Sequence, residues 1–456
     1  MKLVQSKKAS INYLSKIVNI TSFRPHLNAE KLKCCTIDGF NIITGIGSEP
    51  GLYVYFPALS QINSDFLSYA NLYRHKELNK DPEQSGMFED NGRVKAIKLR
   101  GELSEGFILP LIILENYIVS ITNQELKDVK EGTEFDTVEH EGKEFWISKK
   151  YLPKHIQSQG QRAGDKKGKK VPKRLDKVID TQFRFHYDTA LIKKCPFVLT
   201  PDSFIQLSYK IHGTSGISAY VLCHQSLNWK QKIARWLTGE QFDRYDYIYS
   251  SRTVIKNKYY NPQVGSGYYD NIDIWAEADK IVRPKLSRGM SAYYEIVGFL
   301  PNGKYIQKGY DYGCVPPNKG ETYTSEKHFK VRIYRVTETN VDGKVFEYTT
   351  HQVQQWCEKV DLIPVEECYY GKAKDLYPDL DITQNWNENF IKRLSNDPNF
   401  YMEKNSPHCN NKVPHEGLVI KIEDGYSRAF KLKCFKFLNK EQELLDKGEE
   451  NIEDEA

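Results

Sequence analysis

A basic, glycine-containing segment in the middle of the chain constrains the fold most, because it divides the sequence into two parts. Residues 157–177 carry eight Lys or Arg side chains against two Asp, a net charge of +6, together with three glycines and one proline. A stretch with so few apolar residues is typical of a flexible linker. We therefore expect a domain over residues 1–155, a basic linker over 156–179 and a second domain over 180–440.

Charge is distributed unevenly along the chain. The 456 residues have a net charge of +5, but residues 441–456 hold eight acids and one lysine, a net of −7. Subtracting this acidic tail from the total leaves +12 for residues 1–440. Two interpretations stay open: a solvated linker and tail, or a polyanion-binding body whose acidic tail limits non-specific binding.

Composition excludes several classes of protein. With 39% hydrophobic residues the chain can fill the cores of two or three domains, which excludes a disordered chain. The longest apolar run, residues 107–114, contains Pro110 and is far shorter than the roughly 20 residues of a membrane span. The N-terminus lacks the apolar core of a secretory signal, and the nine cysteines form no Cys-x-x-Cys pair. We expect no membrane association and a reducing intracellular compartment, the cytoplasm, with residues 166–174 as an alternative nuclear import signal.

The N-terminal part is rich in strand signals. Asp38-Gly39 separates two β-prone runs, Cys35–Ile37 and Phe40–Ile43, which is the signature of a hairpin. Residues 51–56 predict another strand, and residues 63–74 predict a helical insert. Short strands with one helix favour an OB-like β-barrel, a fold that commonly binds single-stranded nucleic acid, although a purely structural barrel fits these residues equally well.

The C-terminal part mixes strands with amphipathic helices. This pattern predicts an α+β domain with mostly antiparallel strands. The predicted helices are Ser226–Leu237, Tyr268–Val282, Thr350–Val360 and Asn385–Leu394, and the predicted strands are Phe204–Tyr209, Ile333–Val336 and Leu418–Ile422.

Lys210 is the first candidate for chemistry. The predicted strand Phe204–Tyr209 runs into this lysine, and Gly213 allows a tight turn directly after it. A lysine at such a place can project into a cleft, where nearby cations and a bound metal favour the neutral amine that attacks phosphorus. The short Lys-x-His-Gly motif is also compatible with an ordinary surface lysine, so it needs partners.

A second candidate is a hairpin near the C-terminus. If Asp424-Gly425 forms a two-residue turn, Glu416 lies opposite Lys433, and Leu418 lies opposite Lys431. One carboxylate can hold a divalent cation and two ammonium groups can hold phosphates. The alternative is a cross-strand ion pair on an amphipathic hairpin.

Two further residues complete the candidate set. Glu295, in a strand that ends at Gly298, is suited to accept hydrogen bonds from ribose hydroxyls. Arg252, after Ser251, is suited to contact a phosphate. For both, a surface ion pair is the alternative.

Taken in order, these motifs resemble motifs I, Ia, III, IV and V of the covalent nucleotidyltransferase superfamily, which comprises polynucleotide ligases and mRNA capping guanylyltransferases. The residues concerned are Lys210–Gly213, Ser251-Arg252, Tyr294–Gly298, Glu416–Lys421 and Lys431–Lys433. His-Gly after the lysine is similar to RNA ligases of the RNA ligase 2 type. Four other segments resemble the RNA ligase 5 branch, which has an N-terminal OB domain: Pro25–Leu32, Lys98–Gly106, Gly298–Gly303 and Ile306–Gly313.

The resemblance implies an ATP-dependent RNA ligase with an ATP-grasp-like nucleotidyltransferase domain. Lys210 would attack the α-phosphate of ATP to form lysyl-AMP, and AMP would then pass to an RNA 5′-phosphate before a 3′-hydroxyl seals the strand. Glu416 would hold Mg²⁺ or Mn²⁺, and the implied nucleotide-binding residues are His212, Gly213, Arg252, Glu295, Lys431 and Lys433. The implied partner is RNA with 3′-hydroxyl and 5′-phosphate ends, including a nicked duplex, in RNA repair. We expect a monomer.

The sequence departs from the family pattern at one site position. Tyr209 stands where the family usually has an acidic residue, although a tyrosine backbone can still reach the base, and we assign no site to residues 326–415. The alternatives are a DNA ligase, a GTP-dependent capping-type enzyme and a non-catalytic nucleic-acid-binding relative. Only 23 residues follow Lys433, too few for the OB domain that DNA ligases and capping enzymes carry there.

Overall fold

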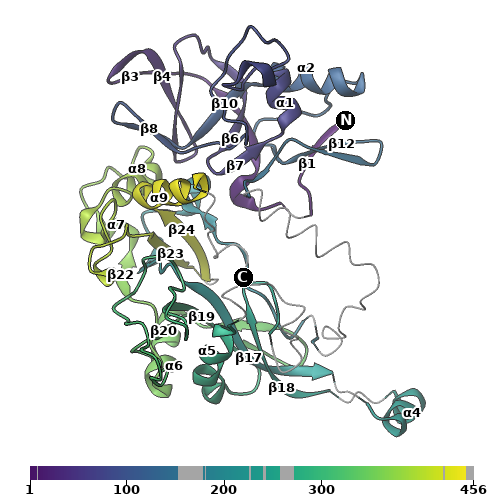
Figure 1. Ribbon diagram of the computed structural model, residues 1–456, viewed down its shortest axis with the longest axis vertical. Helices are drawn as coiled ribbons and strands as arrows, with labels where there is room; N and C mark the ends of the chain where they lie inside the picture. Colours follow the sequence, from purple (N-terminus) through teal and green to yellow (C-terminus); the bar gives the residue numbers. More distant parts are fainter. Residues whose placement is uncertain are drawn as a thin grey trace. The chain divides into compact units, whose positions relative to one another are not determined.

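The computed structural model describes residues 1–7, 9–152, 178–179, 181–224, 227–239, 243–256, 272–424 and 427–447 (Figure 1). The expected basic linker, apart from residues 178–179, and residues 448–456 of the expected acidic tail lie outside the described residues. The chain divides into two compact units. The first comprises Met1–Arg162, Ala190–Val198 and Thr383–Lys392, and the second comprises Ala163–Thr189, Leu199–Ile382 and Arg393–Ala456.

The first unit consists of short antiparallel sheets and two small helices. Its sheets have the orders β10-β6-β2-β11, β3-β4-β5, β1-β12-β13, β14-β7 and β8-β9. The segment Thr383–Lys392 carries most of α8 (Trp386–Leu394). The other elements are β1 (Lys2–Val4), β2 (Ser15–Ile20), β3 (Arg24–His26), β4 (Ala29–Ile37), β5 (Phe40–Gly45), β6 (Gly51–Pro57), β7 (Ser60–Ile62), α1 (Ser64–Tyr69), β8 (Ile97–Leu99), β9 (Glu102–Ser104), β10 (Gly106–Pro110), α2 (Leu111–Thr122), β11 (Glu134–Phe135), β12 (Thr137–His140), β13 (Lys143–Trp146), β14 (Ser148–Lys150) and β15 (Ala190–Leu191).

Strand β6 separates two apolar cores in this unit. Val54 and Phe56 lie in a core that includes residues of α1 and α2, whereas Tyr53 and Tyr55 lie in a core with residues of β4 and β5. Successive side chains of a strand point to opposite faces, so one strand serves both cores. The sheets of the described residues do not close into a barrel, and the OB-like assignment stays a prediction.

The hairpin predicted around Asp38-Gly39 is confirmed. Ile37 pairs with Phe40 across a two-residue turn, and Asp38 has φ 51°, as the tight hairpin turns require.

The second unit holds two larger sheets, with the orders β18-β17-β19-β20-β21 and β24-β23-β16-β22. Its elements are β16 (Phe204–Tyr209), β17 (Thr214–His224), α4 (Trp229–Thr238), β18 (Asp243–Ser251), α5 (Ile274–Val282), β19 (Met290–Gly298), β20 (Phe329–Thr339), β21 (Val345–Glu347), α6 (Thr350–Val360), β22 (Glu367–Lys372), α7 (Ala373–Leu376), β23 (Gly417–Glu423), β24 (Ser427–Lys433) and α9 (Phe435–Asp446).

The central strand β19 is buried along its whole length. Tyr294 and Ile296 face a core shared with α5 and α6, while Tyr293 faces a second core on the opposite side of the sheet. The two sheets of the unit are joined where the buried Lys421 of β23 donates a hydrogen bond to the Tyr334 carbonyl of β20, at 2.7 Å. Burial lowers the pKa of Lys421 to about 8.

Most elements predicted for this unit are confirmed. β16 and α6 have the predicted bounds, and the strands predicted at 333–336 and 418–422 lie within β20 and β23. Helices α4, α5 and α8 begin later than predicted, and residues 226 and 268–271 of those predictions lie outside the described residues. The fold is mixed α and β with mostly antiparallel sheets.

Membrane-spanning helices were also sought, and none of the described helices is both long and apolar enough to cross a bilayer.

The register predicted for the C-terminal hairpin is wrong by one residue. Gly417 pairs with Lys433, and Val419 pairs with Lys431. The last pair is Glu423 with Ser427, so three residues rather than two separate the strands. The loop length sets the register, and Asp-Gly alone does not determine the loop length. Because side chains alternate along a strand, Lys431 and Lys433 still share one face of β24.

Candidate active site

Lys210 lies where the chain crosses from one sheet of the second unit to the other. It follows β16 directly, and β17 begins four residues later at Thr214. The Lys210 amide donates a hydrogen bond of 2.8 Å to the Gly417 carbonyl at the start of β23. The backbone at Lys210 is therefore tied to the residue that directly follows Glu416.

Gly213 is required by the close approach of this crossover to β19. A Cβ atom at Gly213 would lie 2.3 Å from the Ile296 carbonyl oxygen and 2.9 Å from Cγ of Glu295. Both distances are shorter than real Cβ contacts, so a side chain there would force β19 away. The same contact places the buried Glu295 beside the lysine loop.

The segment Ile306–Gly313 braces the lysine loop. The Tyr312 hydroxyl accepts a hydrogen bond of 2.7 Å from the His212 amide, and Gln307 Nε2 donates one of 2.9 Å to the Gly213 carbonyl. The Tyr310 ring lies 4.7 Å from the His212 ring, and its hydroxyl donates to the Pro414 carbonyl at 3.0 Å. Residues 306–313 thus contact both the loop after Lys210 and Pro414, two residues before Glu416.

Three predicted site residues, Lys210, His212 and Lys433, lie close to the carboxylate of the fourth, Glu416. Lys210 Nζ lies 2.7 Å from Oε1 of Glu416, and His212 Nδ1 lies 3.7 Å from Oε2. Lys433 Nζ is 4.0 Å from Oε1. The Glu416 side chain is fully buried, while Lys210 and Lys433 keep a small exposed fraction. Of the two lysines of the predicted cradle, Lys433 lies within 4.0 Å of Glu416, and the cradle's role in holding a cation and phosphates stays a prediction.

Glu416 fits a divalent cation. Its two oxygens are buried and accept no well-aligned hydrogen bond from the described residues. Cations such as Mg²⁺ commonly use one or two carboxylates and take their other ligands from phosphates and water. Within the described ranges, no group of three or more His, Cys, Asp or Glu side chains is placed to hold a metal alone. Glu416 would therefore share the cation with a bound nucleotide.

Lys433 has a second acidic partner that sequence reasoning missed. Glu441, on α9, lies 3.2 Å from Lys433 Nζ and is itself buried. The sequence analysis counted this residue in an acidic tail, but the tail's first residues continue α9 to Asp446. The sequence contains a pattern that indicates this contact, because Phe437 and Glu441 are four residues apart and so share one face of a helix.

Arg252 directly follows β18 in the second unit. It forms an ion pair with Asp188. Burial lowers the pKa of the nearby His186 to about 3, and the charges of Arg252, Arg335 and Lys210 act in the same direction. The charges of Arg252 and Lys210 thus both lower the pKa of the same imidazole. The sequence analysis identified neither His186 nor Asp188.

Tyr209, the departure from the family pattern, lies in a cluster of rings. Its ring centroid is 5.7 Å from Tyr401 and 5.4 Å from both His408 and His415. Burial raises the pKa of Tyr209 to about 12. The segment 326–415 thus supplies all three rings that surround Tyr209, those of Tyr401, His408 and His415.

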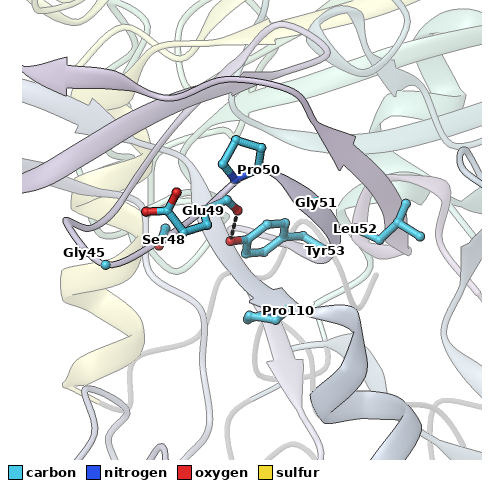
Figure 2. Close-up of a pocket in the computed structure, with 9 residues that line it drawn as sticks. Gly45, Ser48, Glu49, Pro50, Gly51, Leu52, Tyr53 and Pro110 are labelled. Carbon is cyan, nitrogen blue, oxygen red and sulfur yellow. Dashed lines mark hydrogen bonds between the residues drawn. The ribbon is translucent and has the colours of Figure 1, made fainter.

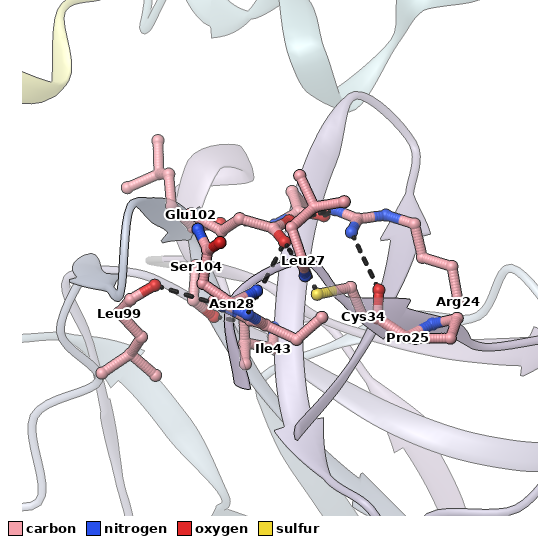
Figure 3. Close-up of polar contacts among 12 residues, drawn as sticks. Arg24, Pro25, Leu27, Asn28, Cys34, Ile43, Leu99, Glu102 and Ser104 are labelled. Atoms are coloured by element: carbon pink, nitrogen blue, oxygen red, sulfur yellow. Dashed lines mark hydrogen bonds and ion pairs between the residues drawn. The ribbon is translucent and has the colours of Figure 1, made fainter. Parts of the chain in front are cut away.

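In the first unit, two segments that resemble the ligase branch meet in a polar cluster (Figure 3). The Glu102 carboxylate forms an ion pair with Arg24 and accepts a hydrogen bond of 2.8 Å from the Leu27 amide. Hydrogen bonding to Arg24 lowers the pKa of Glu102 to about 2. His26 Nε2 lies 3.1 Å from the Leu99 carbonyl oxygen. These contacts join residues 24–34 to residues 97–104.

A cavity of about 560 Å³ also lies in the first unit (Figure 2). The Tyr53 hydroxyl in its wall donates a hydrogen bond of 2.7 Å to the Glu49 carbonyl. None of the predicted site residues belongs to its lining, which consists of Gly45, Gly47, Ser48, Glu49, Pro50, Gly51, Leu52, Tyr53 and Pro110.

The structure thus brings Lys210 and Lys433 to the buried Glu416 carboxylate, and the comparison with solved structures identifies the fold. The sequence matches no protein-family model and no curated protein. Two variants of the Naegleria gruberi RNA ligase, solved with ATP and Mn, share 16% identity with this chain at a TM-score of 0.53, covering 94% of this chain and 99% of theirs. An apo variant of the same ligase shares 14% identity at a TM-score of 0.52, covering 95% and 100%. The chain therefore has an RNA ligase fold.

Proposed function

We propose that this protein is an ATP-dependent RNA ligase that joins 3′-hydroxyl and 5′-phosphate ends through a lysyl-AMP intermediate. The observation that carries the proposal is the 2.7 Å approach of the Lys210 amine to the buried Glu416 carboxylate, in a fold shared with an RNA ligase. The related structures contain ATP and Mn, which supports ATP and a divalent cation as ligands here.

In the first step, Lys210 Nζ attacks the α-phosphorus of ATP. A nitrogen–phosphorus bond forms, the bond to the pyrophosphate oxygen breaks, and the amine loses its proton. Only the neutral amine can attack, yet the contact with Glu416 favours the ammonium form. A divalent cation on Glu416 would neutralise that carboxylate and the phosphate charge. The chain's own contribution is to hold the amine in place through the Gly417 and Gly213 contacts.

The remaining site residues bind the nucleotide. Lys431 and Lys433 share one strand face and would hold the α-phosphate. Glu295, against Gly213, would accept hydrogen bonds from the ribose. Arg252 would contact phosphate, and the braced loop at His212 and Gly213 would shape the pocket floor.

The later steps transfer AMP to an RNA 5′-phosphate, after which a 3′-hydroxyl attacks that phosphate and releases AMP. The partner is RNA with these ends, including a nicked duplex, and the OB-like first unit would bind it in RNA repair. We expect the protein to act as a monomer.

The test is incubation with α-labelled ATP or GTP and Mn²⁺ or Mg²⁺, followed by a denaturing gel. Wild type should be labelled by ATP, Lys210→Ala should not, and the exposed Lys374→Ala variant should match wild type. Label from GTP alone would favour a capping-type enzyme. No label under any condition would leave a non-catalytic binding protein. Sealing of nicked RNA against nicked DNA would then separate an RNA ligase from a DNA ligase.

A further inference from the structure

Lys433 is held between two acidic side chains. Its ammonium lies 3.2 and 3.3 Å from the two carboxylate oxygens of Glu441, and 4.0 Å from Oε1 of Glu416. Both carboxylates are buried, with side-chain exposed fractions of 9% for Glu441 and 0% for Glu416. Lys433 therefore lies closer to Glu441 than to Glu416, the acid that also contacts Lys210.

The helix that carries Glu441 is anchored on the site. At its start, the Glu403 carboxylate accepts hydrogen bonds from the Phe435 and Lys436 amides at 2.6 and 3.1 Å. In the same first turn, the Phe437 ring lies 4.9 Å from the His212 ring and 5.1 Å from Lys433 Nζ. Glu441 is thus presented from a fixed helix face rather than from a mobile tail.

The two contacts of Lys433 compete for one ammonium group. A buried ammonium that loses one carboxylate moves toward the next one, because an unpaired buried charge is costly. Loss of the Glu441 carboxylate would draw Lys433 onto Glu416. Glu416 would then contact a second lysine besides Lys210, and the two ammonium groups together would compete with a divalent cation for its oxygens.

We propose that Glu441 is a positioning residue that keeps Lys433 away from Glu416, so that the Glu416 carboxylate remains available to a divalent cation. This inference rests on the cation-binding role of Glu416 in the proposed function. It assigns α9 a part in the site through Lys433, without contact between Glu441 and the reacting atoms.

The direct test is Mn²⁺ binding to the nucleotide-free protein, followed through the electron paramagnetic resonance signal of free Mn²⁺. Glu441→Gln should weaken Mn²⁺ binding by about fivefold, the upper range for one ion pair. The matched control is Glu443→Gln, the same change two residues along α9 at an exposed position, which should bind Mn²⁺ as wild type does. Thermal unfolding of each variant checks that it is folded.

A double variant separates positioning from a simple loss of negative charge. In a Lys433→Ala background, Glu441→Gln should leave Mn²⁺ binding unchanged, because the lysine that Glu441 holds is absent and cannot join Lys210 at Glu416. An equal weakening in both backgrounds, or no weakening by Glu441→Gln alone, would overturn the proposal.

A kinetic measurement gives an independent readout. In the ATP labelling assay, Glu441→Gln should raise the half-saturating Mn²⁺ concentration by about fivefold and leave the rate at saturating Mn²⁺ near that of wild type. A fall in the saturated rate with an unchanged Mn²⁺ requirement would contradict the proposal. Failure of the proposed function itself appears differently, as absence of label in wild type.

Discussion

Two carboxylates in this protein lie close to cations from distant segments of the chain, Glu102 in the first unit and Glu416 in the second. Glu102 is paired with Arg24 and also accepts a hydrogen bond from the Leu27 amide. Glu416 lies within 4.0 Å of Lys210, His212 and Lys433, yet its oxygens accept no well-aligned hydrogen bond from the described residues.

The difference indicates which carboxylate is structural and which is prepared for a ligand. An acid that is paired with an arginine and accepts a hydrogen bond from a backbone amide stabilises the fold and has little to gain from a ligand. A buried acid surrounded by ammonium and imidazole groups without aligned hydrogen bonds has capacity left for a metal ion. By this criterion the Glu102 cluster joins two segments of the first unit, and Glu416 is the centre of the proposed active site.

The largest expected difference between the two carboxylates is in activity. Glu416→Gln keeps the side-chain shape but removes the charge, so we expect ATP-dependent labelling of Lys210 to fall by about a hundredfold or more. Glu102→Gln should leave the labelling rate within about twofold of wild type, because the partners of Glu102 belong to the first unit and the proposed site residues belong to the second. Initial labelling rates at saturating ATP and Mn²⁺ provide the measurement. Equal losses in the two variants would break the distinction.

Two glycines, Gly213 in the second unit and Gly45 in the first, extend the comparison to the backbone. Gly213→Ala would place Cβ 2.3 Å from the Ile296 carbonyl, so we expect a loss of about 1–3 kcal/mol in unfolding free energy and at least about a tenfold loss of labelling. Gly45→Ala in the first unit meets no atom within 4 Å and should change stability by less than about 0.5 kcal/mol. Urea unfolding and labelling rates measure both effects. A Gly213→Ala variant as stable and active as wild type would show that the crossover does not press on β19.

The smallest effect concerns acid stability. The pKa of Glu102 is lowered from its ordinary 4.5 to about 2, chiefly by the Arg24 hydrogen bond. A depressed carboxyl pKa contributes stability above the ordinary pKa, and that contribution is lost as pH falls from about 4.5 toward 2. Glu102→Gln should therefore lower the unfolding free energy at pH 7 by about 1 kcal/mol, allowing for partial exposure of Arg24. The gap from wild type should close near pH 2 in an unfolding series, and a gap constant with pH would contradict this assignment.

Local sequence signals predicted the elements around the site well. The β-prone run 204–209 and the helical pattern 350–360 have the bounds that the sequence predicts. Motif spacing also identified Lys210 and Glu416, which meet in the structure. These features depend on residues close in sequence or on an ordered set of motifs, so they can be deduced without coordinates.

What the sequence did not predict depends on contacts between distant segments. The register of the β23–β24 hairpin depends on one additional loop residue. Composition places Glu441 in an acidic tail because its neighbours are rich in acids, whereas burial against Lys433 decides its role. The brace from Tyr312 to His212 links residues 100 positions apart, and periodicity cannot reveal such a contact. The closed OB-like barrel expected for residues 1–155 is not observed in the described sheets.

The central claim is that Lys210 carries the adenylate, and mass spectrometry of the intact protein tests it most directly. After incubation with ATP and Mn²⁺, wild type should gain the mass of one AMP, and fragmentation should place that AMP on Lys210. Lys210→Ala should gain none. An AMP on another residue, or one retained in Lys210→Ala, would contradict the account.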